Sequence, residues 1–114
     1  MKLIGSKMED DFREDLIKSH EYHFSANSKS RLKQLLESKK IDVSNAYVIR
    51  WTPDQTDNLF LVLIDGSWLL RIELERYDET VEPVVDRIEI KDYLHGLSRI
   101  DQIKLLVAQD LSKT

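Results

Sequence analysis

The sequence predicts an α+β domain in which an antiparallel meander of three to four strands carries two N-terminal helices and one C-terminal helix on one face. The meander is indicated by an Asp-Gly pair at positions 65 and 66, which can supply the two positive φ angles of a type I′ hairpin turn. An uninterrupted apolar run, residues 59–64, precedes this pair, and apolar and charged residues alternate over residues 68–75. The helices are indicated by apolar residues at helical spacing at both ends of the chain.

Size and composition favour one small domain. A chain of 114 residues is long enough to bury a single hydrophobic core, so we expect one domain over residues 1–114. The absence of cysteine excludes disulfides and thiolate metal sites and fits a reducing compartment. No segment has the roughly 18 consecutive apolar residues of a membrane span, and the N-terminus has no apolar core of signal-peptide length. We therefore expect a soluble, cytoplasmic protein without a membrane partner.

The charge balance indicates the kind of partner. The chain has 21 Asp and Glu residues against 17 Lys and Arg, which gives a formal net charge of −4 at pH 7. Because the backbone of a nucleic acid is itself negative, we expect no nucleic-acid partner. A basic protein would be attracted instead.

The first helix is predicted over residues 7–22. The segment Ser6-Lys7-Met8-Glu9 fits a capping box, in which the Ser6 hydroxyl accepts a hydrogen bond from the Glu9 amide and the Glu9 carboxylate reaches back to the Ser6 amide. Apolar residues at Met8, Phe12 and Leu16 then recur at helical spacing.

A second helix is predicted after a polar break at residues 25–28. Asn27 or Ser28 can serve as its N-cap. The helix is expected to end near Lys39, because a lysine is favourable at the negative end of the helix dipole. Its apolar face consists of Leu32, Leu35 and Leu36.

Three consecutive strands are predicted over residues 46–52, 58–65 and 68–75. A two-residue loop at Asp65 and Gly66 fixes a register that pairs Leu63 with Trp68, Leu61 with Leu70, and Leu59 with Ile72. We expect this face of the hairpin to lie under the helices. The opposite face would be covered by residues 77–90 or by another chain, such as a second copy in a homodimer, and would carry Phe60, Val62, Ile64 and Leu69.

The register of the first strand stays open, because the loop at residues 52–57 is long enough to hide a bulge. One register places Tyr47, Ile49 and Trp51 on the second face. The other register places Ala46, Val48 and Arg50 there.

The C-terminal part of the chain is predicted to add a fourth strand and a last helix. An acidic connection at residues 77–83 leads to a strand over residues 84–90, and residues 92–95 form at most a short helical turn closed by Gly96. Ser98 and Asp101 form a variant capping box at the start of the last helix. The apolar face of that helix is expected to consist of Ile100, Ile103, Leu106, Val107 and Leu111.

Two histidines are candidate metal ligands. His20 and His23 are three positions apart, a spacing that can place two imidazoles on one metal ion. A third ligand would have to come from Glu14, Glu21 or His95, and the HExxH pattern of zinc hydrolases is absent. Polar side chains at a helix end explain the pair better, so we expect no metal site and no cofactor.

Three carboxylates suggest an alternative function. Asp65, Glu73 and Glu75 are similar to the acidic residues of PD-(D/E)xK nucleases, where carboxylates on neighbouring strands hold a divalent metal. Two of them on one strand face could bind Mg²⁺ that positions water against a phosphodiester. However, Glu75 occupies the place of the usual lysine, and the hairpin turn already accounts for Asp65. We therefore expect no catalytic residue and keep the Mg²⁺-dependent nuclease as an alternative.

Acidic residues crowd into two segments, the first helix and the connection after the third strand. Acids in the first turn stabilise a helix dipole, yet Glu14 and Asp15 lie beyond that turn. Clusters of like charge also steer a cationic partner into contact. The candidate partner-binding residues are Glu9, Asp10, Asp11, Glu14, Asp15, Asp78, Glu79 and Glu82.

Three segments cover most of the chain: an acidic helix, SKMEDDFREDLIKSH, a meander, AYVIRWTPDQTDNLFLVLIDGSWLLRIELER, and a closing helix, SRIDQIKLLVAQDL. Together they resemble the small immunity proteins that are encoded beside secreted or contact-delivered bacterial toxins. The resemblance implies a cytoplasmic inhibitor that binds one cognate toxin, often a nuclease with a basic cleft, and whose acidic surface mimics the phosphates of the substrate. The expected function is thus neutralisation of a basic toxin by direct binding. The alternatives are the nuclease and a self-associating structural subunit.

Overall fold

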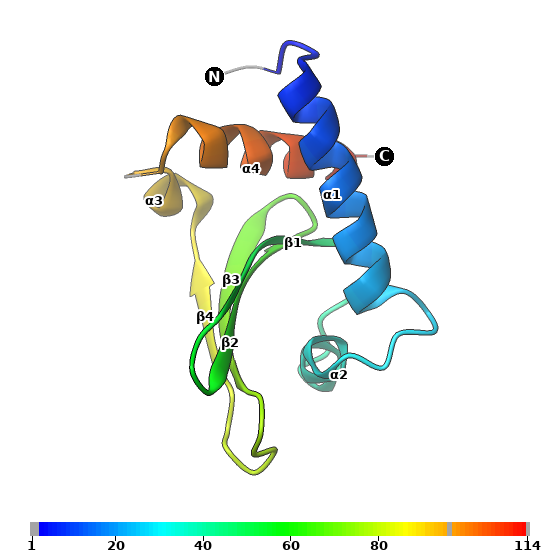
Figure 1. Ribbon diagram of the computed structural model, residues 1–114, viewed down its shortest axis with the longest axis vertical. Coiled ribbons are helices and arrows are strands. Elements are labelled where there is room, and N and C mark those ends of the chain that lie inside the picture. Colours follow the sequence, from blue (N-terminus) through cyan, green and yellow to red (C-terminus); the bar gives the residue numbers. More distant parts are fainter. Residues whose placement is uncertain (1–2, 96, 114) are drawn as a thin grey trace.

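A four-stranded antiparallel sheet in the order β1-β2-β3-β4 is the centre of the computed structural model, which describes residues 3–95 and 97–113 (Figure 1). The four strands run in sequence order and each pairs with the next, so the predicted meander and its fourth strand are confirmed. The strands are β1 (Ala46–Pro53), β2 (Asp57–Ile64), β3 (Trp68–Glu75) and β4 (Val84–Ile88).

The helices flank this sheet in the predicted order, which confirms the α+β class. They are α1 (Lys7–Phe24), α2 (Arg31–Ser38), α3 (Ile90–Leu94) and α4 (Arg99–Ser112). The capping box of α1 is present, with the Ser6 hydroxyl accepting from the Glu9 amide at 3.2 Å. Helix α2 begins later than predicted, because Ser30 is its N-cap and Ser28 instead bonds to the carbonyls at the end of α1. Gly96, expected to close the turn of α3, lies outside the described residues.

The hairpin between β2 and β3 has a longer loop than predicted. Asp65 and Gly66 have φ angles of 52° and 68°, as a type I′ turn requires. Ser67 is an additional loop residue, so that Ile64 pairs with Trp68 and Leu63 with Leu69. The predicted register is therefore wrong by one residue, and a slip of one residue exchanges the two faces of a strand.

Two hydrophobic cores lie on opposite faces of the sheet. On one face, Leu32 and Leu36 of α2 pack against alternate residues of β2 and β3, which are Phe60, Val62, Ile64, Leu70, Ile72 and Leu74. On the other face, α4 and Leu16 of α1 pack against Leu61, Leu63 and Leu69. The helices thus cover both faces rather than one, as Figure 1 shows for α2 beside the sheet and α4 above it. The face expected to await residues 77–90 or another chain is buried under α2.

A bulge in β1 resolves the open register. Ala46 and Val48 lie opposite Ile64 and Val62, and the pairing then shifts so that Arg50 lies opposite Leu61. Because Ile49 is the extra residue, the strand changes its alternation there. The α2 face consequently carries Ala46, Val48 and Trp51, whereas Tyr47, Ile49 and Arg50 belong to the α4 face, a division that neither predicted register contained.

The C-terminal helix packs through part of its predicted apolar face, since Val107 and Leu111 are buried and Ile103 packs against the core, but Leu105 and Ala108 take the place of Ile100. Its N-cap is Ser98, whose hydroxyl accepts from the Asp101 amide at 3.1 Å, as expected. Its buried residues are Leu105, Val107, Ala108 and Leu111, whereas Ile100 is 54% exposed. Among the described residues, none of the helices is long and apolar enough to cross a membrane.

Candidate functional site

The acidic residues of α1 that were predicted as partner contacts lie mostly on its surface. Asp10, Asp11, Glu14 and Asp15 are exposed. Lys7 is 3.6 Å from Asp11, and Lys18 is 3.0 Å from Glu14. These ion pairs are exposed to solvent, so they hold the carboxylates only weakly.

Glu9 is the exception among these acids, because it is only 5% exposed. Its carboxylate accepts hydrogen bonds of 3.0 Å from the backbone amides of Ile4 and Gly5. These bonds hold the pKa of Glu9 below its ordinary value, chiefly through the amide of Ile4. Glu9 therefore fastens the segment before α1 and is not offered to a partner.

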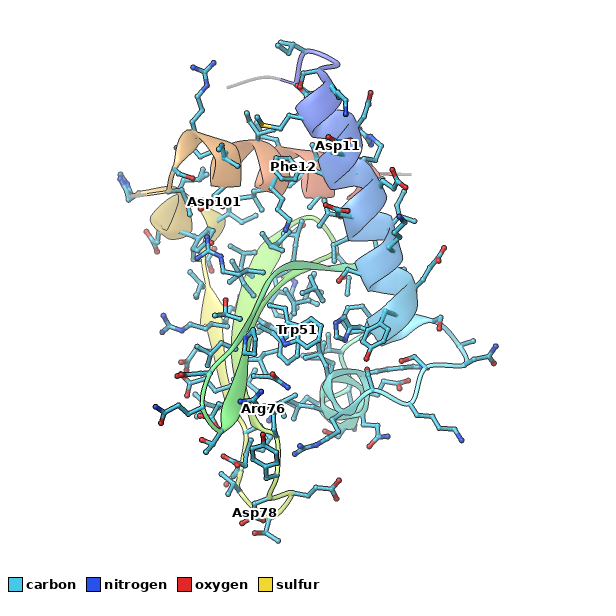
Figure 2. All side chains as sticks on the ribbon, viewed as in Figure 1. Asp11, Phe12, Trp51, Arg76, Asp78 and Asp101 are labelled. Carbon is cyan, nitrogen blue, oxygen red and sulfur yellow. The ribbon has the colours of Figure 1, made fainter. Side chains whose placement is uncertain are left out.

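The second acidic cluster lies far from the first. Asp78, Glu79 and Glu82 are exposed in the loop between β3 and β4. Asp78 is engaged locally, since it accepts from the Thr80 amide at 2.9 Å and from its hydroxyl at 2.6 Å, which lowers the pKa of Asp78. Figure 2 shows Asp11 and Asp78 toward opposite ends of a molecule whose longest extent is 45 Å. An interface of about 800 Å² per partner is only about 32 Å wide, so the two clusters do not form one contact site.

A shallow groove of about 480 Å³ runs along the outer side of α1. Ile17 lies in this groove with 41% of its surface exposed, beside the carboxylates of Asp10, Glu14 and Glu21. Arg13 also lines the groove, but its guanidinium pairs with Asp110 of α4 at 3.0 Å. We call Asp10, Glu14, Ile17 and Glu21 the α1 contact face, whereas Asp11 and Asp15 are exposed on α1 outside the groove.

A second cavity, of about 190 Å³, opens where the end of α1 and the start of α2 meet the sheet. We call it the aromatic cleft. Its walls come from all of the first five elements, and its lining residues are Tyr22, His23, Ser30, Arg31, Leu32, Trp51, Asn58, Phe60 and Leu74. Figure 2 shows Trp51 on the side of the sheet that faces α1 and α2.

The rings of the cleft have a regular arrangement. Trp51 stands between Tyr22 and Phe60 in a nearly parallel series, with centroid distances of 6.5 Å to Tyr22 and 5.9 Å to Phe60 and ring planes inclined by 19° and 18°. The His23 ring is perpendicular to the series and lies 5.5 Å from both Trp51 and Phe60. Tyr22 and Trp51 remain 67% and 49% exposed.

His23 closes the inner end of the cleft. The residue is 4% exposed, and its Nδ1 atom has no hydrogen-bond partner among the described residues. Burial lowers the pKa of the imidazole below its ordinary value of 6.5, because a charged ring would lose its hydration. The ring is therefore neutral at pH 7. Its Nδ1 is a buried polar atom for which the described residues provide no hydrogen bond.

Arg31 provides the positive charge of the cleft. Its guanidinium donates to the backbone carbonyl of Glu75, across the gap between α2 and β3. No carboxylate lies within ion-pair distance of Arg31 among the described residues. The charge of Arg31 is thus not neutralised by its surroundings.

The two histidines that the sequence suggests as metal ligands have separate surroundings. His20 Nδ1 lies 2.5 Å from the carbonyl oxygen of Ala46, whereas His23 belongs to the aromatic cleft. The carboxylates of the nuclease alternative are also apart, since Asp65 is in the hairpin turn and Glu75 ends β3, which spans about 25 Å. Within the described residues, no three His, Cys, Asp or Glu side chains are grouped to hold a metal ion.

Comparison of the chain with protein-family models, with curated proteins and with solved structures finds no match. Sequence reasoning identified Asp10 and Glu14 of the contact face, but not Glu21, Ile17 or the cleft. The only signals for the cleft were Tyr22-His23 at a helix end and a tryptophan on a strand, and the face of that tryptophan depends on the bulge at Ile49.

Proposed function

We propose that this protein is a non-catalytic, cytoplasmic inhibitor of the immunity type, which neutralises a basic partner by binding it through the α1 contact face. The proposal rests on one observation, the exposure of Ile17 among carboxylates on the same side of α1. Interfaces typically combine an apolar centre with a polar rim. A partner with a basic rim around an apolar side chain would match this face.

The two parts of the contact face have different effects on binding. Desolvation of Ile17 favours the bound state and slows dissociation. The surrounding carboxylates act at a distance and accelerate association with a cationic surface. The lysines on α1 interfere little, because exposed ion pairs contribute only about 0–1 kcal/mol and exchange readily. The acids of the β3–β4 loop lie outside this interface.

The experiment begins with purification of the tagged protein from its native host, with identification of the bound protein by mass spectrometry. Association is then measured by stopped-flow fluorescence for the variant Asp10→Asn/Glu14→Gln/Glu21→Gln. We expect association at low salt to slow by roughly tenfold, with a flatter salt dependence and an unchanged dissociation rate. Ile17→Ala should instead raise the dissociation rate.

The matched control is the variant Glu37→Gln/Glu89→Gln/Asp92→Asn, which removes the same charge from exposed positions on α2, before α3 and on α3. It should leave both rate constants unchanged. A control as slow as the α1 variant would show that only net charge matters, and the contact face would be rejected. Mg²⁺-dependent cleavage of nucleic acid that is lost in Glu73→Gln would reject the inhibitor function altogether.

A further inference from the structure

The aromatic cleft presents two partly exposed rings, Tyr22 and Trp51, against which a planar group can stack. Aromatic rings stack in offset or edge-to-face arrangements with centroids about 4.5–7 Å apart. Tyr22 and Trp51 are nearly parallel, and their centroids are 6.5 Å apart. Tyr22 lies on the last turn of α1 and is 67% exposed, so its side chain is free to adjust.

The polar groups of the cleft determine which charge such a ligand carries. Arg31 lines the cavity without a carboxylate partner among the described residues. It is also the first residue of α2, where the helix dipole is positive. Both features favour an acidic group and oppose a cationic one.

His23 forms part of the cavity wall beside Trp51 and Phe60. Its Nδ1 is buried at the inner end of the cavity without a hydrogen-bond partner among the described residues, and an unsatisfied buried polar group costs stability. This atom is closed off from solvent, so a ligand in the cleft would contact the ring of His23 and not its Nδ1. The volume of about 190 Å³ limits the ligand to one ring system with a short polar substituent.

We propose that the aromatic cleft binds a small aromatic acid, with its planar ring against the exposed surfaces of Tyr22 and Trp51 and its carboxylate or phosphate on Arg31. The site uses neither the acids nor the Ile17 side chain of the α1 contact face, so it stands independently of the inhibitor function. It is a binding site for a small molecule at the junction of α1, α2 and the sheet.

Three probes of similar size test this proposal without altering the protein. Phenylacetate carries a planar ring and an acid, cyclohexylacetate carries the acid without a planar ring, and 2-phenylethylamine carries the ring with the opposite charge. Binding is followed by ¹H–¹⁵N correlation NMR and by the fluorescence of Trp51 in a Trp68→Phe background. We expect phenylacetate to bind with a dissociation constant of about 1 mM, and the other two probes to bind at least tenfold more weakly.

Matched variants locate the site. Arg31→Gln and Tyr22→Ala should each weaken the binding of phenylacetate at least fivefold. Arg87→Gln and Tyr77→Ala alter an exposed arginine and an exposed tyrosine outside the cleft, and should not change it. Spectra of each variant without probe establish that it is folded.

The proposal is overturned by any of three results. Phenylacetate could leave the signals of the cleft residues unchanged up to 20-fold above the expected dissociation constant of about 1 mM. The amine could bind as tightly as the acid, which would refute the role of Arg31 and indicate a cage for a cation. Binding could also persist unchanged in both Arg31→Gln and Tyr22→Ala, which would place the ligand elsewhere.

Discussion

The hydroxyl of Ser30 donates a hydrogen bond of 2.7 Å to the backbone carbonyl of His23. The same oxygen accepts from the Lys33 amide at 3.1 Å, so one side chain caps the start of α2 and satisfies a carbonyl in the last turn of α1. This contact fixes the two helix ends that form one wall of the aromatic cleft.

Ser30→Ala should therefore destabilise the protein more than loss of an ordinary N-cap. Ser98 supplies the comparison, because its hydroxyl caps α4 and makes no second bond among the described residues. We expect Ser98→Ala to cost about 1 kcal/mol, and Ser30→Ala about 1 kcal/mol more. Urea denaturation followed by circular dichroism measures both. Equal costs would show that the bond to His23 contributes nothing.

Gly66 and Gly5 form a matched pair of positive-φ glycines. Their φ angles are 68° and 76°, but a β-carbon on Gly66 would meet Cβ of Ser112 at 3.0 Å, whereas one on Gly5 would meet nothing within 4 Å. Gly5→Ala should cost about 1–2 kcal/mol of backbone strain at most, and Gly66→Ala distinctly more. The additional loss of unfolding free energy in Gly66→Ala should shrink when Ser112 is also replaced by glycine. Denaturant unfolding of both single variants and the double variant measures this coupling.

His23 should make the stability of the protein depend on pH. Burial lowers the pKa of the folded imidazole below the 6.5 of the unfolded chain, so the unfolded state takes up a proton first as the pH falls. Stability is therefore full above pH 6.5 and declines between that value and the lower folded pKa. His23→Phe should remove this decline, and His95→Gln, at an exposed position, should keep it. Thermal unfolding between pH 8 and pH 5 distinguishes the two variants.

The coverage of the sheet by α2 predicts the effect of two further substitutions. Leu36 is fully buried in the core under α2, and Ile100 is 54% exposed on α4. Leu36→Ala should cost about 2–5 kcal/mol, whereas Ile100→Ala should change the unfolding free energy by less than about 0.5 kcal/mol. Guanidinium denaturation tests both. A large cost for Ile100→Ala would restore its predicted place on the apolar face of α4, and a small cost for Leu36→Ala would contradict its burial under α2.

The local signals in the sequence specified the elements and their order. Serines before apolar periodicity marked the starts of α1 and α4, because a capping hydroxyl and its amide partner are only three residues apart. The Asp65-Gly66 turn was equally local, since both residues carry the positive φ angles that define it. The exposed acids of α1 were also correctly placed on a helix surface.

Two extra residues in the strand pairing set the registers that the sequence pattern left undecided. Ser67 lengthens the hairpin loop, and Ile49 bulges out of β1. Each extra residue shifts the strand pairing by one position and so exchanges the two faces of the strand. The local sequence pattern is compatible with both registers. The β2 strand is apolar on both sides, so its composition gave no preference for either face.

The sequence by itself determined the α+β class, the strand order and the acidic character of α1, because these depend on propensities and spacings within a few residues. Only the tertiary structure decided that α2 and α4 cover opposite faces and that Trp51 joins Tyr22, His23 and Arg31 in a cleft. The cleft unites side chains from segments far apart in the chain, and their meeting depends on the register at one bulge. A register is set by the packing of both faces together, which no local pattern records.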